Sequence, residues 1–109
     1  MKRVIVESPY AGDIERNVRY ARACMADCLR RGESPYASHL LYTQPGVLRD
    51  DVPEERTLGI KAGFAWRSVA DMSVFYADLG WSLGMFEGRA HCLDNGTDYE
   101  IRYLRGEWC

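Results

Sequence analysis

Long apolar runs, paired cysteines and an excess of charge are all missing from this chain of 109 residues. No apolar run approaches the ~20 residues of a membrane-spanning helix, and the first residues lack the apolar core of a signal peptide. The four cysteines include no Cys-x-x-Cys pair, and two histidines are too few to complete a metal shell. A net charge of −2 gives no general attraction to nucleic acid. We expect one cytoplasmic domain over residues 1–109, with no cofactor, no metal, no membrane and no nucleic-acid partner.

The usual catalytic signatures are missing as well. The sequence contains no Gly-x-x-x-x-Gly-Lys loop, no Gly-x-Ser-x-Gly elbow and no dinucleotide fingerprint. The common nucleotide-binding enzymes and the serine hydrolases are therefore not supported.

Strand and helix patterns alternate along the chain. The predicted strands cover residues 3–7, 37–42, 72–77 and 99–104, and the predicted helices cover residues 14–31, 53–70 and 83–93. The connections are long enough for parallel pairing. This order predicts an α/β fold, a doubly wound parallel sheet of four to five strands in the order 2-1-3-4, with helices on both faces.

A doubly wound sheet binds ligands at the carboxyl ends of strands 1 and 3, where the strand order reverses. The residues brought to this edge are Glu7, Ser8, Tyr10, Gly12, Asp71, Asp78, Ser82 and Gly84. Residues 45–52 form a loop that could fold over the edge as a lid.

The turn before the last helix carries a possible anion site. Ser82, Gly84 and Met85 lie at a helix N-terminus, whose free N–H groups can hold a phosphate or carboxylate; the alternative is a simple capped helix start. Glu87 lies in the first turn, where a carboxylate suits the helix dipole whether or not it is functional. His39, inside the predicted second strand, is either a buried imidazole satisfied by a neighbour or a ligand contact.

Several of these segments resemble the nucleoside 2-deoxyribosyltransferase superfamily, closest to its small uncharacterised phage and actinobacterial relatives. They are residues 4–12 (Val-Ile-Val-Glu-Ser-Pro-Tyr-Ala-Gly), the pairs Ser38-His39 and Ala70-Asp71, and above all residues 82–90 (Ser-Leu-Gly-Met-Phe-Glu-Gly-Arg-Ala). The resemblance covers nearly the whole chain. It implies a flavodoxin-like fold, a homodimer or higher homo-oligomer, and a nucleoside or nucleotide as the small-molecule partner.

The resemblance also implies roles for individual residues. The loop from Ser8 to Gly12 would contact sugar or phosphate, Ser82 and Gly84 would contact phosphate or sugar, and Asp71 would match the acid that protonates the leaving base. The attacking glutamate of the family directly follows a Gly-Met or Gly-Tyr pair, where this chain has Phe86, with Glu87 one place later.

Two functions follow from these alternatives. Either the helix start is shifted so that Glu87 serves as nucleophile in an N-glycosidase or deoxyribosyltransferase, or the nucleophile is absent. In the second case Phe86 stacks on a base or fills the pocket, and the chain is a non-catalytic binder of a nucleotide or nucleotide-derived signal. The small residues and aromatics around Gly63, Phe64 and Trp66 predict an oligomer.

Overall fold

The computed structural model describes residues 1–106 and 108 and contains four strands and four helices. In chain order these are β1 (Lys2–Glu7), α1 (Ile14–Arg30), β2 (Glu33–Tyr36), α2 (Ser38–Leu41), α3 (Pro53–Arg67), β3 (Met72–Tyr76), α4 (Leu83–Asn95) and β4 (Tyr99–Arg102). The strands form one sheet in the order β2-β1-β3-β4, and every pair is parallel. The predicted flavodoxin-like α/β fold and strand order are confirmed, with four strands.

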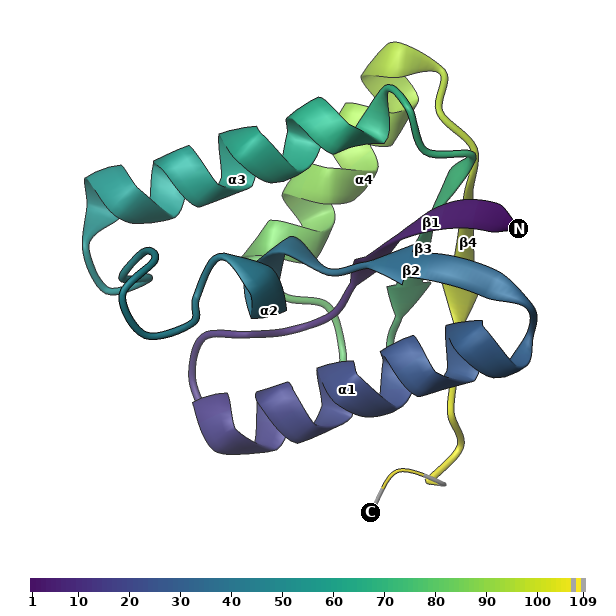
Figure 1. Ribbon diagram of the computed structural model, residues 1–109, viewed down its shortest axis with the longest axis horizontal. Helices are drawn as coiled ribbons and strands as arrows, with labels where there is room; N and C mark the ends of the chain where they lie inside the picture. The colour runs from purple at the N-terminus through teal and green to yellow at the C-terminus, as the bar shows by residue number, and fades with distance from the viewer. Residues whose placement is uncertain (107, 109) are drawn as a thin grey trace.

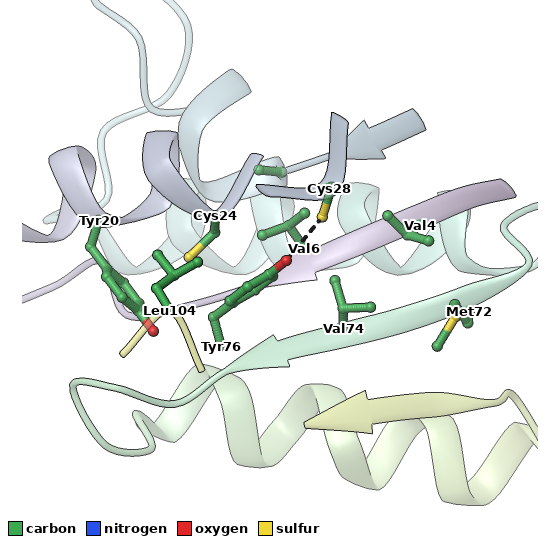
Figure 2. Close-up of a cluster of buried hydrophobic side chains, with 10 residues drawn as sticks. Val4, Val6, Tyr20, Cys24, Cys28, Met72, Val74, Tyr76 and Leu104 are labelled. Carbon is green, nitrogen blue, oxygen red and sulfur yellow. Dashed lines mark hydrogen bonds between the residues drawn. The ribbon is translucent and has the colours of Figure 1, made fainter. Parts of the chain in front are cut away.

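Helices cover both faces of the sheet: α1 packs on one face, and α3 and α4 pack on the other (Figure 1). The core under α1 is the larger, and Figure 2 shows its side chains between the helix and the central strands. Its fully buried members include Val4, Val74, Cys24 and Tyr76. The opposite face has a smaller apolar cluster of Phe75, Met85 and Cys92, and Arg67 and Ser73 are buried beside this cluster.

The ends of α1 and α4 follow local sequence signals. Asp13 caps α1 by accepting a hydrogen bond from the Arg16 backbone N–H at 3.2 Å, and Ser82 caps α4 by accepting from Met85 N–H at the same distance. Helix α4 ends at Asn95, and the next residue, Gly96, has a φ of 64°, the left-handed conformation that glycine adopts without strain.

The prediction of a second strand over residues 37–42 is wrong. Strand β2 comes earlier and includes Pro35, which an edge strand tolerates because one of its sides needs no ladder hydrogen bonds. Residues 38–41 form the single turn α2, with Leu41 and Tyr42 donating backbone hydrogen bonds to Ala37 and Ser38. His39 therefore lies in a short helix just after the carboxyl end of β2.

The other boundaries differ by a few residues. Helix α3 ends at Arg67, three residues before the predicted end, while α4 continues two residues further than predicted. In the described part of the chain, no helix is both long and apolar enough to cross a membrane. The sequence after the last strand predicts a short tail over residues 106–109, and this prediction lies partly outside the described residues, which omit 107 and 109.

Candidate functional site

A pocket of about 180 Å³ lies at the carboxyl edge of the sheet, beyond the end of β1. It is lined by the end of β1 and the following loop, by α2, by one side of α3 and by the start of α4. Of the predicted site residues, Ser8, Tyr10, His39, Ser82 and Gly84 line it. The pocket is therefore where the strand-order reversal predicts a ligand site.

Glu7, the last residue of β1, lies at the base of this pocket. Its Oε1 accepts a hydrogen bond from Nη2 of Arg67 at 2.6 Å, and the Glu7 side chain is only 17% exposed. Burial raises the pKa of Glu7, and the neighbouring Arg67 guanidinium offsets this only in part. The structure shows no hydrogen bond to Oε2 in the described part of the chain, so that oxygen is free to meet a ligand.

Arg67 is held on several sides beneath α3 and α4. Its Nη1 donates to the Ser73 hydroxyl and to the Gly88 carbonyl, both at 3.1 Å, and it contacts the sulfur of Cys92 at 2.9 Å. The Arg67 side chain is 1% exposed. Because Arg67 cannot move without losing these bonds, it fixes the Glu7 carboxylate in place.

Ser8 and His39 form a second polar pair in the pocket. The Ser8 hydroxyl and Nε2 of His39 are 2.6 Å apart, and which of the two donates depends on the imidazole tautomer. Burial lowers the pKa of His39 to about 4. The imidazole is therefore neutral at pH 7. The pair can donate a hydrogen bond to a ligand or accept one from it.

The start of α4 presents backbone donors to the same space. Ser82 Oγ accepts from Met85, and the Ser82 carbonyl accepts from Phe86, but the N–H groups of Leu83 and Gly84 have no partner in the described residues. Two free N–H groups at the positive end of a helix favour an anion.

Arg56 and Asp50 form the outer wall of the pocket. Arg56 Nε lies 3.8 Å from Asp50 Oδ1, and among the described residues the terminal guanidinium nitrogens form no hydrogen bond. Asp50 belongs to the loop expected as a lid, and both residues also line a wider adjoining hollow of about 880 Å³. The pocket therefore opens, beside the positively charged Arg56, into a wider hollow that can hold the part of a ligand that extends beyond the pocket.

The expectation that Asp71 lies at this edge is wrong. Asp71 precedes β3, so it is at the amino end of the sheet, where its carboxylate accepts a hydrogen bond from the Arg3 backbone N–H at 2.7 Å. That hydrogen bond holds the pKa of Asp71 below its ordinary value, which makes Asp71 a poor proton donor.

Asp78 follows β3 at the correct edge but does not line the pocket. Its carboxylate accepts hydrogen bonds from the Tyr20 hydroxyl and from the backbone N–H groups of Leu104 and Arg105. Burial alone would raise the pKa of Asp78, but these bonds outweigh it and lower the value. The arrangement ties α1 and the C-terminal segment to the sheet.

The remaining predicted residues lie around the pocket rather than in its wall. Met85 is fully buried in the cluster with Phe75, and Phe86 is 49% exposed beside Trp81. Glu87 is partly exposed and forms no hydrogen bond or ion pair among the described residues. Gly12, with φ of 99°, lines the adjoining hollow.

Sequence reasoning missed Arg67 and Gly88, whose carbonyl accepts a hydrogen bond from Arg67. Ile60, Gly63, Phe64 and Arg67 follow helical i, i+3, i+4, i+7 spacing and all line the pocket. An arginine on such a buried stripe needs a buried partner, and this is the signal that could have paired Arg67 with Glu7.

The small and aromatic residues that predicted an oligomer make contacts within the chain. Gly63 packs against α2, where an added Cβ would lie 2.8 Å from the Ser38 hydroxyl, and the Phe64 ring stacks on His91 at 4.2 Å. Trp66 is half exposed and donates to the Tyr42 hydroxyl at 3.1 Å. The oligomer therefore stays a prediction.

Comparison with known proteins places the chain in a family without assigning an activity. The model of a family described as a domain of unknown function (DUF7768) matches residues 2–103. Neither a curated protein nor a solved structure matches the chain. Because the match covers nearly the whole sequence, this chain belongs to the DUF7768 family.

Proposed function

We propose that the carboxyl-edge pocket binds a nucleoside or its 5′-monophosphate. The observation that carries this proposal is the convergence of three kinds of recognition group in one pocket: a helix N-terminus, a polar cluster around a buried carboxylate, and aromatic surface. A nucleotide has three matching parts, which are phosphate, sugar and base.

The phosphate is assigned to the outer part of the pocket. The free N–H groups of Leu83 and Gly84 are hydrogen-bond donors there, and Arg56 supplies a positive charge. Charge-assisted hydrogen bonds of this kind are about twice as strong as neutral ones.

The sugar is assigned to the base of the pocket. Glu7 Oε2 can accept a hydrogen bond from a sugar hydroxyl, and the pair of Ser8 and His39 can accept or donate one. Tyr10 lies at the boundary with the adjoining hollow and offers an aromatic ring to the base.

A second candidate function is cleavage or transfer at the N-glycosidic bond of the bound ligand. Glu7 favours this function, because it places a carboxylate oxygen in the pocket where a sugar would lie. The location of Asp71 at the far edge and of Glu87 outside the pocket wall favours binding alone, as in a protein that sequesters a nucleotide signal.

Isothermal titration calorimetry with deoxynucleosides and their 5′-monophosphates tests the binding proposal. The wild type should bind at least one monophosphate, and Arg56→Gln should weaken that binding about 10-fold or more while leaving the matching nucleoside unaffected.

Leu83→Pro provides a sharper test of the helix N-terminus. Proline suits the first helical position and removes one free N–H, and Ser82 already has the extended backbone that a residue before proline prefers. Leu83→Ala is the matched control, since it truncates the same exposed side chain but keeps the N–H. Weaker monophosphate binding in the proline variant alone supports the proposal; no binding by the wild type, or equal binding by both variants, contradicts it.

A further inference from the structure

The two edge strands of the sheet differ in how open they are to a further strand. Strand β2 contains Pro35, and proline is one of the residues with which natural edge strands discourage pairing, because it has no backbone N–H. Strand β4, at the other edge, contains neither proline nor glycine. The sheet can therefore be extended at β4 more readily than at β2.

The outer backbone groups of β4 belong to alternate residues. The carbonyls of Asp98 and Arg102 accept hydrogen bonds from backbone N–H groups of the neighbouring β3 segment, both at 3.0 Å, so these carbonyls point towards β3. Successive residues of a strand direct their backbone groups to opposite sides. The N–H and C=O groups of Tyr99, Ile101 and Tyr103 therefore point away from the sheet, and no loop backbone in the described part of the chain bonds them.

The side chains of this edge are exposed although they are apolar or aromatic. Ile101 is 45% exposed and Tyr103 is 54% exposed. The Tyr99 ring packs edge-on against Phe75 with 5.6 Å between ring centroids, so this row of side chains lies on the face of the sheet that α4 covers. Helix α4 leaves the outer part of the row open, and a further strand beside β4 would cover it.

The sequence of the edge is complementary to itself. Residues 99–103 read Tyr-Glu-Ile-Arg-Tyr. When this segment lies antiparallel to a second copy with Ile101 opposite Ile101, Tyr99 lies opposite Tyr103 and Glu100 lies opposite Arg102. Aromatic pairs and pairs of opposite charge are favourable when they are directly opposed. The residues whose backbone groups point outward are also those that exchange hydrogen bonds in this register.

The neighbouring registers are disfavoured by charge. Moving the twofold axis by one residue towards the start of β4 places Glu100 opposite Glu100 of the second copy. Moving it by one residue the other way places Arg102 opposite Arg102. Like charges that are directly opposed on two strands destabilise the pair. Backbone direction and charge therefore select the same register, with the axis at Ile101.

We propose that β4 pairs antiparallel with β4 of a second copy of this chain, about a twofold axis at Ile101, so that the two sheets join into one. The proposal does not depend on the nucleotide pocket. It places the contact at β4 and not at Gly63, Phe64 and Trp66 on α3. Because the joined strands are antiparallel, the carboxyl ends of the two halves lie at opposite edges of the joined sheet, and each pocket is built by one copy alone.

Sedimentation velocity over a range of protein concentrations tests the contact. Ile101→Pro removes the outward N–H, whereas the hydrogen bonds to β3 come from the neighbouring residues and stay. Ile101→Val is the matched control, because it keeps the N–H and a β-branched apolar side chain. The wild type and Ile101→Val should form dimers. Ile101→Pro should weaken dimerisation at least about 10-fold, because each copy loses the hydrogen bond that it donates at the axis.

Cysteine cross-linking tests the register without the proline variant. Opposed Cα atoms of a hydrogen-bonded antiparallel pair are about 5.5 Å apart, which a disulfide can span. Ile101→Cys should therefore give a disulfide-linked dimer under mild oxidation. Tyr103→Cys is the matched control, because residue 103 and its own copy are four residues out of line, roughly 13 Å. Both variants are made with Cys109→Ser, since the other three cysteines are buried.

A dimer that is lost in Ile101→Pro, kept in Ile101→Val and cross-linked through Ile101→Cys alone supports the proposal. A wild type that stays monomeric up to about 100 µM overturns it, as does a folded Ile101→Pro protein that dimerises like the wild type. Circular dichroism establishes whether this variant is folded. If it is not, the cysteine variants decide: no cross-link through Ile101→Cys, or equal cross-linking by the two cysteine variants, overturns the proposal.

Discussion

Two buried arginines, one on each face of the sheet, are satisfied in different ways. On the α1 face, Arg102 makes two hydrogen bonds of 2.7 Å to the two carboxylate oxygens of Glu33 and also contacts Glu100 and Tyr76. On the opposite face, Arg67 makes one hydrogen bond to Glu7 and leaves the second carboxylate oxygen free at a pocket.

The two pairs differ in how much of the carboxylate the arginine engages. Both oxygens of Glu33 are engaged by Arg102, and this hydrogen bonding holds the pKa of Glu33 below its ordinary value. Glu7 is bonded on one side only, and burial raises its pKa. A perturbed carboxylate with a free oxygen in a pocket is typical of a functional site.

The largest effect is expected from Arg102→Met, which leaves Glu33 buried without its partner. Removing one member of a buried pair costs about 3–5 kcal/mol of unfolding free energy, and urea denaturation measures it. Ligand affinity of the folded protein should not change. Arg67→Met should destabilise the fold similarly but also abolish binding, so equal binding by both variants would erase the distinction between the two pairs.

The next largest effect is a pH dependence of the unfolding free energy that comes from His39. Its folded pKa of about 4 lies below the ordinary 6.5, so the unfolded chain binds the proton more tightly and stability falls as the pH drops from 6.5 towards 4. At about 1.4 kcal/mol per pH unit, the full loss is about 3 kcal/mol. Glu7 acts in the opposite direction, because its raised pKa favours the folded state on protonation.

His39→Gln isolates the histidine contribution. The free energy of unfolding of this variant should fall less than that of the wild type between pH 6.5 and pH 4, as measured by urea titrations at matched ionic strength. Parallel curves for the two proteins would show that His39 is not held neutral by burial.

Gly88→Ala should destabilise the protein by about 1–3 kcal/mol, because the added methyl group overpacks against the fixed Glu7 carboxylate. Gly84→Ala is the matched control on the same helix: its Cβ would meet only the Ser82 hydroxyl at 3.9 Å, so no destabilisation is expected. In a Glu7→Ala background the cost of Gly88→Ala should shrink, and an undiminished cost would mean that Glu7 is not the obstacle.

The smallest effect is expected from Tyr20→Phe. The Tyr20 hydroxyl donates to the Asp78 carboxylate and accepts from the Asp78 backbone N–H at 2.9 Å, so its loss should cost about 1–2 kcal/mol. Thermal unfolding measures this cost. Nucleotide binding should be unchanged, because Asp78 holds the fold together and does not line the pocket. A loss of binding free energy greater than the loss of unfolding free energy would show that Asp78 belongs to the binding site.

The parts of the fold with strong local signals could be predicted from the sequence. The Asp13 and Ser82 caps, the glycine at position 96 and the buried run at residues 4–6 each specify local structure, and their alternation specifies a parallel sheet. Residues 37–42 could not be assigned, because a short apolar run fits a strand and a helical turn equally well.

The site was predictable only to the level of the sheet edge. The strand-order rule correctly gathers Ser8 and Ser82, which come from two distant segments. His39 joins them because residues 38–41 form a helical turn after β2. The predicted strand over residues 72–77 already places Asp71 before the strand and so at the amino end of the sheet, and this boundary is confirmed. The rule cannot show that Gly88 leaves room for Glu7, because that depends on a contact between distant residues.

The most direct test of the carboxyl-edge pocket is an NMR titration of ¹⁵N-labelled protein with a deoxynucleoside 5′-monophosphate. The account predicts saturable shifts that are largest for the backbone amides of Ser8, Gly12, Leu83 and Gly84, with little change at Asp71 and Arg102. An absence of shifts, or shifts centred on the amino end of the sheet around Asp71, would contradict it.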